Sequence, residues 1–351
     1  MQGVKKILII SDLGAKPIKL YIDAMPKLGK GFIRLGHDVR YFNYGGVLAA
    51  MSPLKNRRFA KFFYKSKVDL LLAEMAKHYR PHIVYVGFAK YLDGHTIDMV
   101  RNVVPEATFI GGDGDPWPQL QEGRIETARH LDILLATNDG VFLQQYKDAG
   151  VKRCYFMPNM CDPDTDHRYE VEDQWKTDIL WTGKLEHRAD TSETFRGELI
   201  EQLAKRKNCA IYGCLGRPAV SGLDYFYAIS GAKIGVSVNA YSDVKFCHSD
   251  RLTHYLACGT FVLAKRMKDC DGLYTDGRHL KFFDTIDEFF ELADWFLKHE
   301  EERRKIADAG MNWVHEQFNC VKIASYMLEL IEKGNYAAPW FNYLSTGSMK
   351  I

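Results

Sequence analysis

The run SDRLTHYLACGTFVLA, from Ser249 to Ala264, contains a complete helix–strand step. Ser249 suits a helix N-cap, because its hydroxyl can accept a hydrogen bond from a free backbone N–H group. Gly259 suits the position just after the helix, where the chain turns left-handed. Residues 260–264 form a short, β-rich apolar run that is typical of a buried parallel strand. The run therefore predicts a helix–strand step of an α/β domain.

The amino end of this helix is suited to an anion. Free N–H groups and the helix dipole favour a phosphate there, and Arg251 in the first turn adds a fixed charge with a planar fork of donors. Arg251, His254 and Cys258 share one face of the helix. Leu252 and Leu256 lie on another face and are expected to pack inward. A plain packing helix is the simpler interpretation of the same pattern.

The rest of the chain alternates strand and helix patterns. In the first half, strands are expected at 6–11, 37–44, 81–88, 107–115, 131–136 and 153–157, and helices at 19–36, 68–79, 96–103 and 139–149. After a polar break at 160–176, strands are expected at 178–182, 209–212 and 233–238, and helices at 195–205, 286–298, 300–318 and 321–333. Strands separated by helices imply parallel sheets with right-handed crossovers. A chain of 351 residues suits two such domains.

The net charge of +2 conceals an asymmetry. Residues 1–153 carry 23 Lys and Arg against 15 Asp and Glu, whereas the remainder carries 24 against 30. A basic first half suggests an anionic partner, although solvated lysines on an ordinary surface are the simpler explanation. The eight cysteines form no C-x-x-C pair, so we expect neither zinc nor disulfides, and a reducing cytoplasm fits best. The opening MQGVKKILII is interpreted as a strand rather than a leader, and no apolar run reaches membrane-spanning length.

Several motifs together resemble one family. Arg251, Ala257, Cys258 and Gly259 match the pattern Arg–x–x–Glu–x–x–Ala–Cys–Gly of the CgeB-like (spore maturation protein) branch of group 1 glycosyltransferases. The runs GDGDPW, DILLATNDGVFLQQYKDAGV, FMPNMCDPDTDH and TDILWTGKLEHR match that family in order, so the resemblance spans about residues 110–331. His254 stands where the family has glutamate, and Phe246 where many retaining relatives have a second one.

The resemblance implies a fold and a reaction. The expected fold is GT-B, which is α/β with two facing Rossmann-like domains and a C-terminal helix that returns to the first domain. We expect an acceptor domain at 1–160, a donor domain at 161–325 and a returning tail at 326–351. The implied reaction moves a sugar from a nucleotide diphosphate sugar, a UDP-sugar being expected, to an acceptor hydroxyl in the cleft, without a metal or a cofactor. The alternatives are a phage-type enzyme that glycosylates a hydroxymethylated DNA base and a non-catalytic nucleotide- or sugar-binding protein.

Candidate donor-binding residues follow the strands of the second half and open the key helix. A glycine loop can approach a diphosphate closely, and an aromatic ring at a strand end can stack on a nucleobase. Each position also has an ordinary structural explanation, such as a plain turn or a packed core side chain. The candidates are Gly183, Lys184, Arg188, Tyr212, Gly213, Tyr241, Ser242, His248, Ser249, Asp250, Arg251 and His254.

The candidate catalytic residues are Asp113 and Asp115 in GDGDPW. One carboxylate at the carboxyl end of this strand could take the proton of the acceptor hydroxyl as a general base. We prefer Asp113 to Asp115. Asp115 directly precedes a proline, which holds its backbone extended and favours a structural role for it. A metal-binding Asp–x–Asp and a turn that only shapes the crevice are the other interpretations. Gly14 and Trp117 are candidate acceptor-binding residues.

A basic, aromatic segment lies in the first half. Six cations interleave with four rings: Lys55, Arg57, Arg58, Lys61, Lys65 and Lys67 with Phe59, Phe62, Phe63 and Tyr64. The segment could meet an anionic membrane that carries a lipid-linked acceptor, or a nucleic-acid backbone. A solvated helix with an apolar core face is the commonest outcome of such a pattern. The expected partners are thus a nucleotide-sugar donor and an acceptor that is anionic: lipid-linked, polysaccharide or nucleic acid.

Overall fold

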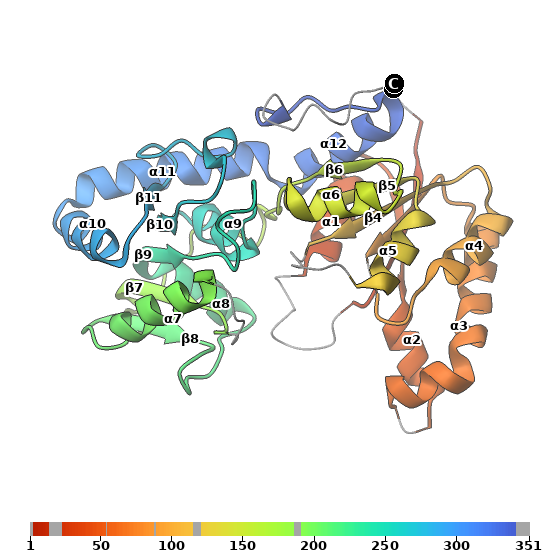
Figure 1. Cartoon of the computed structure of the whole chain (residues 1–351), viewed down its shortest axis with the longest axis horizontal. Coiled ribbons are helices and arrows are strands. Elements are labelled where there is room, and N and C mark those ends of the chain that lie inside the picture. Colours follow the sequence, from red (N-terminus) through yellow and green to blue (C-terminus); the bar gives the residue numbers. More distant parts are fainter. Residues whose placement is uncertain are drawn as a thin grey trace.

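A computed structural model of the chain describes residues 3–13, 23–53, 55–87, 89–114, 121–185 and 191–341. It contains two α/β domains, each built on a sheet in which every paired strand is parallel (Figure 1). The predicted fold class is therefore confirmed at the level of architecture. Among the described residues, no helix is both long and apolar enough to cross a membrane.

The first domain holds a six-stranded sheet in the order β2-β1-β3-β4-β5-β6. Its strands are β1 (Lys6–Ser11), β2 (Asp38–Asn43), β3 (Ile83–Gly87), β4 (Thr108–Asp113), β5 (Ile133–Ala136) and β6 (Cys154–Phe156). Its helices are α1 (Ala24–Arg34), α2 (Tyr44–Met51), α3 (Arg57–Tyr79), α4 (Gly94–Val103), α5 (Glu122–Arg129) and α6 (Val141–Asp148). Successive residues of β1 enter different cores: Ile7 and Ile9 pack on one face of the sheet, Leu8 and Ile10 on the other.

The second domain holds a five-stranded sheet in the order β11-β10-β9-β7-β8. Its strands are β7 (Thr177–Thr182), β8 (Cys209–Tyr212), β9 (Ala232–Ser237), β10 (Phe261–Lys265) and β11 (Lys281–Phe283). Its helices are α7 (Thr191–Leu203), α8 (Leu223–Ser230), α9 (Asp250–Ala257), α10 (Ile286–Lys298) and α11 (Glu300–Gln317). The step from α9 to β10 follows the expected pattern, with Gly259 at a φ of +68° between helix and strand.

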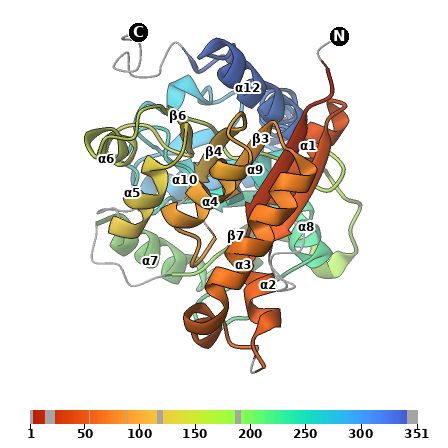
Figure 2. The same ribbon diagram turned by 90° about the vertical axis from the view of Figure 1, so that its right-hand side faces the viewer.

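The last helix, α12 (Cys320–Lys333), crosses back to the first domain and packs on α1 (Figures 1 and 2). The helices meet closely at Gly31, where a Cβ would collide with the carbonyl of Cys320. Beyond α12 the chain stays on the first domain, because the Tyr336 hydroxyl donates to the Phe156 carbonyl at 2.6 Å and Trp340 is fully buried. The chain end therefore ties the two domains together.

Some helices begin earlier than the sequence pattern indicates. The side chain of Asn56 accepts hydrogen bonds from the backbone N–H groups of Arg58 and Phe59, so α3 begins at Arg57 instead of near residue 68. The segment after β2 was expected to be strand up to Tyr44. Tyr44 instead opens α2, where Asn43 caps the helix by accepting from the N–H of Gly46. Local caps decided both boundaries.

Candidate functional site

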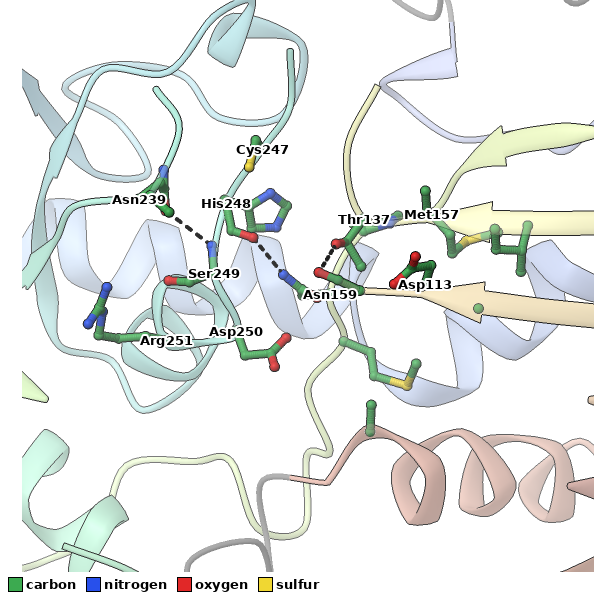
Figure 3. Close-up of a pocket in the computed structure, with 18 of the residues that line it drawn as sticks. Asp113, Thr137, Met157, Asn159, Asn239, Cys247, His248, Ser249, Asp250 and Arg251 are labelled. Atoms are coloured by element: carbon green, nitrogen blue, oxygen red, sulfur yellow. Dashed lines mark hydrogen bonds between the residues drawn. The ribbon is translucent and has the colours of Figure 1, made fainter. Parts of the chain in front are cut away.

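A cavity of about 350 Å³ lies between the two domains. The first domain contributes the carboxyl ends of β4 and β5 and the segment after β6. The second domain contributes the segment after β9 and the amino end of α9 (Figure 3). Strand carboxyl ends and a helix amino end from two sheets thus face one space, which is the usual binding position in open α/β folds.

The amino end of α9 forms the second-domain wall of this cavity. Ser249 occupies the N-cap position, as predicted, but its hydroxyl makes no cap bond and is buried with no hydrogen-bond partner among the described residues. The backbone N–H of Ser249 donates to the Asn239 side chain at 3.1 Å, and Asn159 of the first-domain wall donates to the His248 carbonyl at 2.9 Å (Figure 3). Two asparagines therefore hold the start of α9 in place, and the Ser249 hydroxyl is left to bond a ligand.

Arg251 carries a partly buried positive charge next to this helix start. Its guanidinium donates to the carbonyls of Thr182, at 2.5 Å, and Val238, at 3.0 Å, and stacks 3.8 Å from the centre of the Trp181 ring. No carboxylate of the described residues pairs with it. Burial lowers the pKa of Arg251, because water is removed from around the charged form. The site thus holds a cation that an anionic ligand would stabilise.

A second arginine, Arg196 of α7, also lines the cavity and is buried. The positive charge of Arg196 further lowers the pKa of Arg251, because the two guanidinium groups repel each other. Arg196, Asn239 and Asn159 are not among the residues predicted from the sequence. For the two asparagines a signal was present, because polar residues directly after predicted strands mark the binding edge of a parallel sheet.

His248 lines the cavity as a neutral ring. Its Nδ1 lies 2.9 Å from the Phe246 carbonyl, which assigns the proton to Nδ1, and Nε2 has no partner among the described residues. Burial lowers the pKa of His248 to about 4. Phe246 provides this carbonyl from a left-handed turn, with a φ of +58°, and its ring packs 5.0 Å from that of Phe156. The backbone of residue 246 thus positions His248, and the Phe246 side chain packs at the domain boundary.

Asp113 lies at the end of β4, buried, on the opposite wall. One of its oxygens accepts a hydrogen bond from Arg124 at 2.5 Å, and the other accepts from the Tyr146 hydroxyl at 2.5 Å. Burial, followed by the charge of Asp113, raises the pKa of Tyr146. Both carboxylate oxygens are therefore engaged before any acceptor arrives. Asp115, Gly14 and Trp117, like Arg188, lie outside the described residues.

His254 is not available to a ribose in this structure. Its Nε2 lies 3.0 Å from the Lys27 ammonium and its Nδ1 lies 3.2 Å from the Tyr225 hydroxyl. Because an ammonium only donates, Nε2 is the acceptor and the ring is neutral. Burial, and then the charge of Lys27, lower the pKa of His254 well below its usual value. The residue that replaces the family glutamate joins the two domains instead.

Asp250, in the first turn of α9, lines the cavity as well, whereas the remaining described donor candidates do not. Gly183 has a φ of +142°, and a Cβ there would come 2.5 Å from the Arg251 guanidinium, so this glycine makes room for the arginine. Gly213 packs against the backbone of Gly183. Lys184 is exposed, Tyr212 is half-buried, and Tyr241 packs edge-on to Phe142 of the first domain, while the Ser242 carbonyl accepts from Lys268.

Comparisons with known proteins give one family match and several solved structures of the same fold. Residues 196–329 match the family model described as "Glycosyl transferase-like", whereas no curated protein matches the chain. Anabaena Alr3699/HepE, solved in complex with UDP, superposes with a TM-score of 0.56 at 10% identity, covering 94% of this chain and 100% of that one.

Two further solved structures share the fold. Sucrose-phosphate synthase (tll1590) from Thermosynechococcus elongatus superposes with a TM-score of 0.60 at 13% identity, over 94% of this chain and 98% of that one. A putative UDP-N-acetylglucosamine 2-epimerase from Listeria monocytogenes gives 0.54 at 11%, over 99% and 100%. Proteins with different names thus share the architecture, and the family match rather than the fold points to the chemistry. The chain has a GT-B fold, and residues 196–329, from α7 to α12, are similar to the glycosyl transferase-like family.

Proposed function

We propose that this protein transfers a sugar from a nucleoside diphosphate sugar to a hydroxyl group of an acceptor in the interdomain cavity. The observation that carries the proposal is the partly buried Arg251 beside the uncapped start of α9, with no carboxylate partner among the described residues. A cation and free helix N–H groups at one end of a cavity suit a diphosphate. UDP is the expected nucleotide, because the Anabaena protein of the same fold was solved with it.

The second-domain wall would act on the leaving group. As the bond between sugar and diphosphate breaks, negative charge grows on the diphosphate oxygens. The dipole of α9 and the charges of Arg251 and Arg196 would stabilise that charge without reorganising, because the protein already holds them in place. This arrangement needs no metal ion, so we expect a chelator to leave the rate unchanged. His248 Nε2 would then accept a hydrogen bond from a sugar hydroxyl, and the Ser249 hydroxyl would donate to a sugar or phosphate oxygen.

The first-domain wall would receive the acceptor. Asp113 is the described carboxylate that lines the cavity on this side. We propose it as the base, with Arg124 and Tyr146 holding its orientation through hydrogen bonds. The engagement of both oxygens also favours a second candidate function, namely binding of a nucleotide sugar without catalysis. Release of nucleoside diphosphate from the donor separates the two, because a pure binder releases none.

Binding of UDP and of uridine tests the donor site. Replacing Arg251 with Ala should weaken UDP binding by about 1.5–3 kcal/mol, because a charge-assisted contact to the phosphates is lost. Uridine has no phosphate, so its affinity should not change in the same variant. Isothermal titration calorimetry measures both. Arg251→Lys is the matched control, because it keeps the charge and loses the planar fork, and it should bind UDP with intermediate affinity.

The uridine measurement protects the result against a structural artefact. If Arg251→Ala weakens UDP and uridine equally, the arginine only holds the walls of the cavity together. If neither affinity changes, the diphosphate lies elsewhere and the proposal fails.

A further inference from the structure

The first turns of α3 carry three exposed phenylalanines. Phe59, Phe62 and Phe63 are 40%, 79% and 64% exposed, and their spacing places them on one face of the helix. Leu70, two turns later on the same face, is 60% exposed. We call these four residues the α3 stripe. A cluster of exposed rings such as Phe59, Phe62 and Phe63 marks an interaction site, because single exposed apolar residues are common and clusters are not.

The flanks of the α3 stripe are positively charged. Residues 55–68 contain no Asp or Glu. Four cations border the stripe and form no ion pair with the described residues: Lys55, Arg58, Lys61 and Lys67. The Lys61 ammonium lies 6.0 Å from the Phe62 ring, and the Lys67 ammonium lies 5.8 Å from the Tyr64 ring. Such side chains cover apolar surface with their stems while the charges stay in water.

The opposite face of α3 is already occupied. Ala60, Val68 and Leu72 are fully buried in the core of the first domain. Below them Asp69 accepts hydrogen bonds from the Tyr44 hydroxyl at 2.6 Å and from Lys65 at 2.8 Å. The helix is therefore fixed from beneath, and the α3 stripe plays no part in docking it. The pair α2 and α3 projects from the first domain (Figures 1 and 2).

We propose that the α3 stripe inserts into the interface of an anionic lipid bilayer, with the four bordering cations at the headgroups. A helix with an apolar face and a basic border lies in the interfacial plane, and each cation adds attraction to anionic lipid. The stripe is on a projection rather than in a groove, which suits insertion. A nucleic acid would need open ring faces, but Phe59 and Phe63 pack on each other, with centroids 4.7 Å apart.

Vesicle co-sedimentation of the full chain tests this surface and requires no sugar transfer. The protein should bind phosphatidylcholine vesicles that contain phosphatidylglycerol, bind pure phosphatidylcholine weakly, and lose binding as salt rises. The triple variant Phe59→Ser, Phe62→Ser, Phe63→Ser should bind at least about tenfold more weakly, because the apolar contact is lost. Arg58→Ala, Lys61→Ala, Lys67→Ala should also lose about tenfold or more, and only on anionic vesicles.

Matched controls lie on the second domain. Leu215 and Trp295 are 43% and 44% exposed, so Leu215→Ser with Trp295→Ser removes apolar surface of similar exposure. Lys298→Ala, Arg304→Ala, Lys305→Ala removes three exposed cations of α10 and α11. Both control variants should bind vesicles like the original protein. Melting temperatures establish that every variant is folded. If the phenylalanine variant is unfolded, the variant Arg58→Ala, Lys61→Ala, Lys67→Ala decides the test by itself.

Three results would overturn the proposal. The first is no vesicle binding, or an equal loss in the control variants. The second is binding to single- or double-stranded DNA without binding to vesicles, which would assign the segment to nucleic acid. The third is a dimer in solution that the phenylalanine variant converts to a monomer, which would make a second copy the occupant.

Discussion

At the scale of single residues, Asp113 is both the proposed base and the centre of a hydrogen-bond network with Arg124 and Tyr146, and these two roles can be separated. Replacing Asp113 with Asn should lower the rate of sugar transfer by about 10²–10⁴-fold, because the base is lost. UDP binding should persist, because the second-domain wall of the cavity is intact. Tyr146→Phe is the matched control. It removes one hydrogen bond to the carboxylate, at 2.5 Å, and keeps the carboxylate. Transfer rates under saturating donor measure both. A Tyr146→Phe variant as inactive as Asp113→Asn would show that the network shapes the crevice and that Asp113 is no base.

Gly183 lies outside the cavity but leaves the space that the Arg251 guanidinium occupies. A methyl group there would lie 2.5 Å from the Arg251 guanidinium, and its φ of +142° disfavours any side chain. Gly183→Ala should lower the free energy of unfolding by roughly 1–3 kcal/mol and weaken UDP binding. Gly216→Ala is the control, because Gly216 also has a positive φ, of +73°, but open space around it. Urea unfolding and calorimetry check this; equal effects of both changes on UDP binding would contradict it.

At the scale of elements, one face of α1 holds the interdomain segment. Lys27 pairs with Asp166 at 2.6 Å, Lys30 pairs with Asp162 at 2.7 Å, and Arg34 pairs with Asp164. The acidic stretch after residue 160 reads in the sequence as a polar break. In the structure Asp162 and Asp166 are buried, 5% and 0% exposed. The break is therefore a fixed connection, and α1 is the element that fixes it to α9 through Lys27 and His254.

Lys27→Met tests this connection. Removing the Lys27 ammonium leaves the fully buried Asp166 carboxylate without its cation, so the free energy of unfolding should fall by about 3–5 kcal/mol. The double variant with Asp166→Asn should recover much of the loss, because no uncompensated charge remains. Denaturant unfolding of the two variants measures the difference. Equal instability of single and double variants would mean that Lys27 contributes by packing rather than by charge.

At the scale of the whole molecule, buried neutral histidines make stability depend on pH. Burial lowers the pKa of His248 to about 4, and burial with the nearby Arg278 lowers that of His279 to about 4, from a usual 6.5. Between these values the unfolded chain binds protons that the folded chain does not, so stability falls as pH falls from 6.5 to 4. Each histidine accounts for on the order of 3 kcal/mol of this loss.

His279→Gln provides the measurement, because His279 stacks on Trp313 away from the cavity. The variant should be less stable than the original protein near neutral pH by an amount that shrinks as the pH approaches 4. Urea unfolding across this pH range reports the two slopes. Parallel curves for the two proteins would show that His279 does not titrate on unfolding.

The sequence alone determined the architecture. Alternating buried strands and amphipathic helices, a serine at the N-cap position and a left-handed Gly259 are local features, and local features suffice to specify two parallel sheets and the step from α9 to β10. They also placed Asp113 and the start of α9 at strand and helix ends, which share one edge in this class of fold.

Only the tertiary structure decided what those residues touch. Lys27 and His254 are 227 positions apart, yet their side chains meet at 3.0 Å, and burial then makes the ring neutral and engages both its nitrogens. Arg124 and Tyr146 occupy the oxygens of Asp113 in the same way. No periodicity reports such pairs, because they depend on how two sheets are placed and on which side chains lose water. A residue's place in an element is local, whereas its charge and its partners belong to the packed molecule.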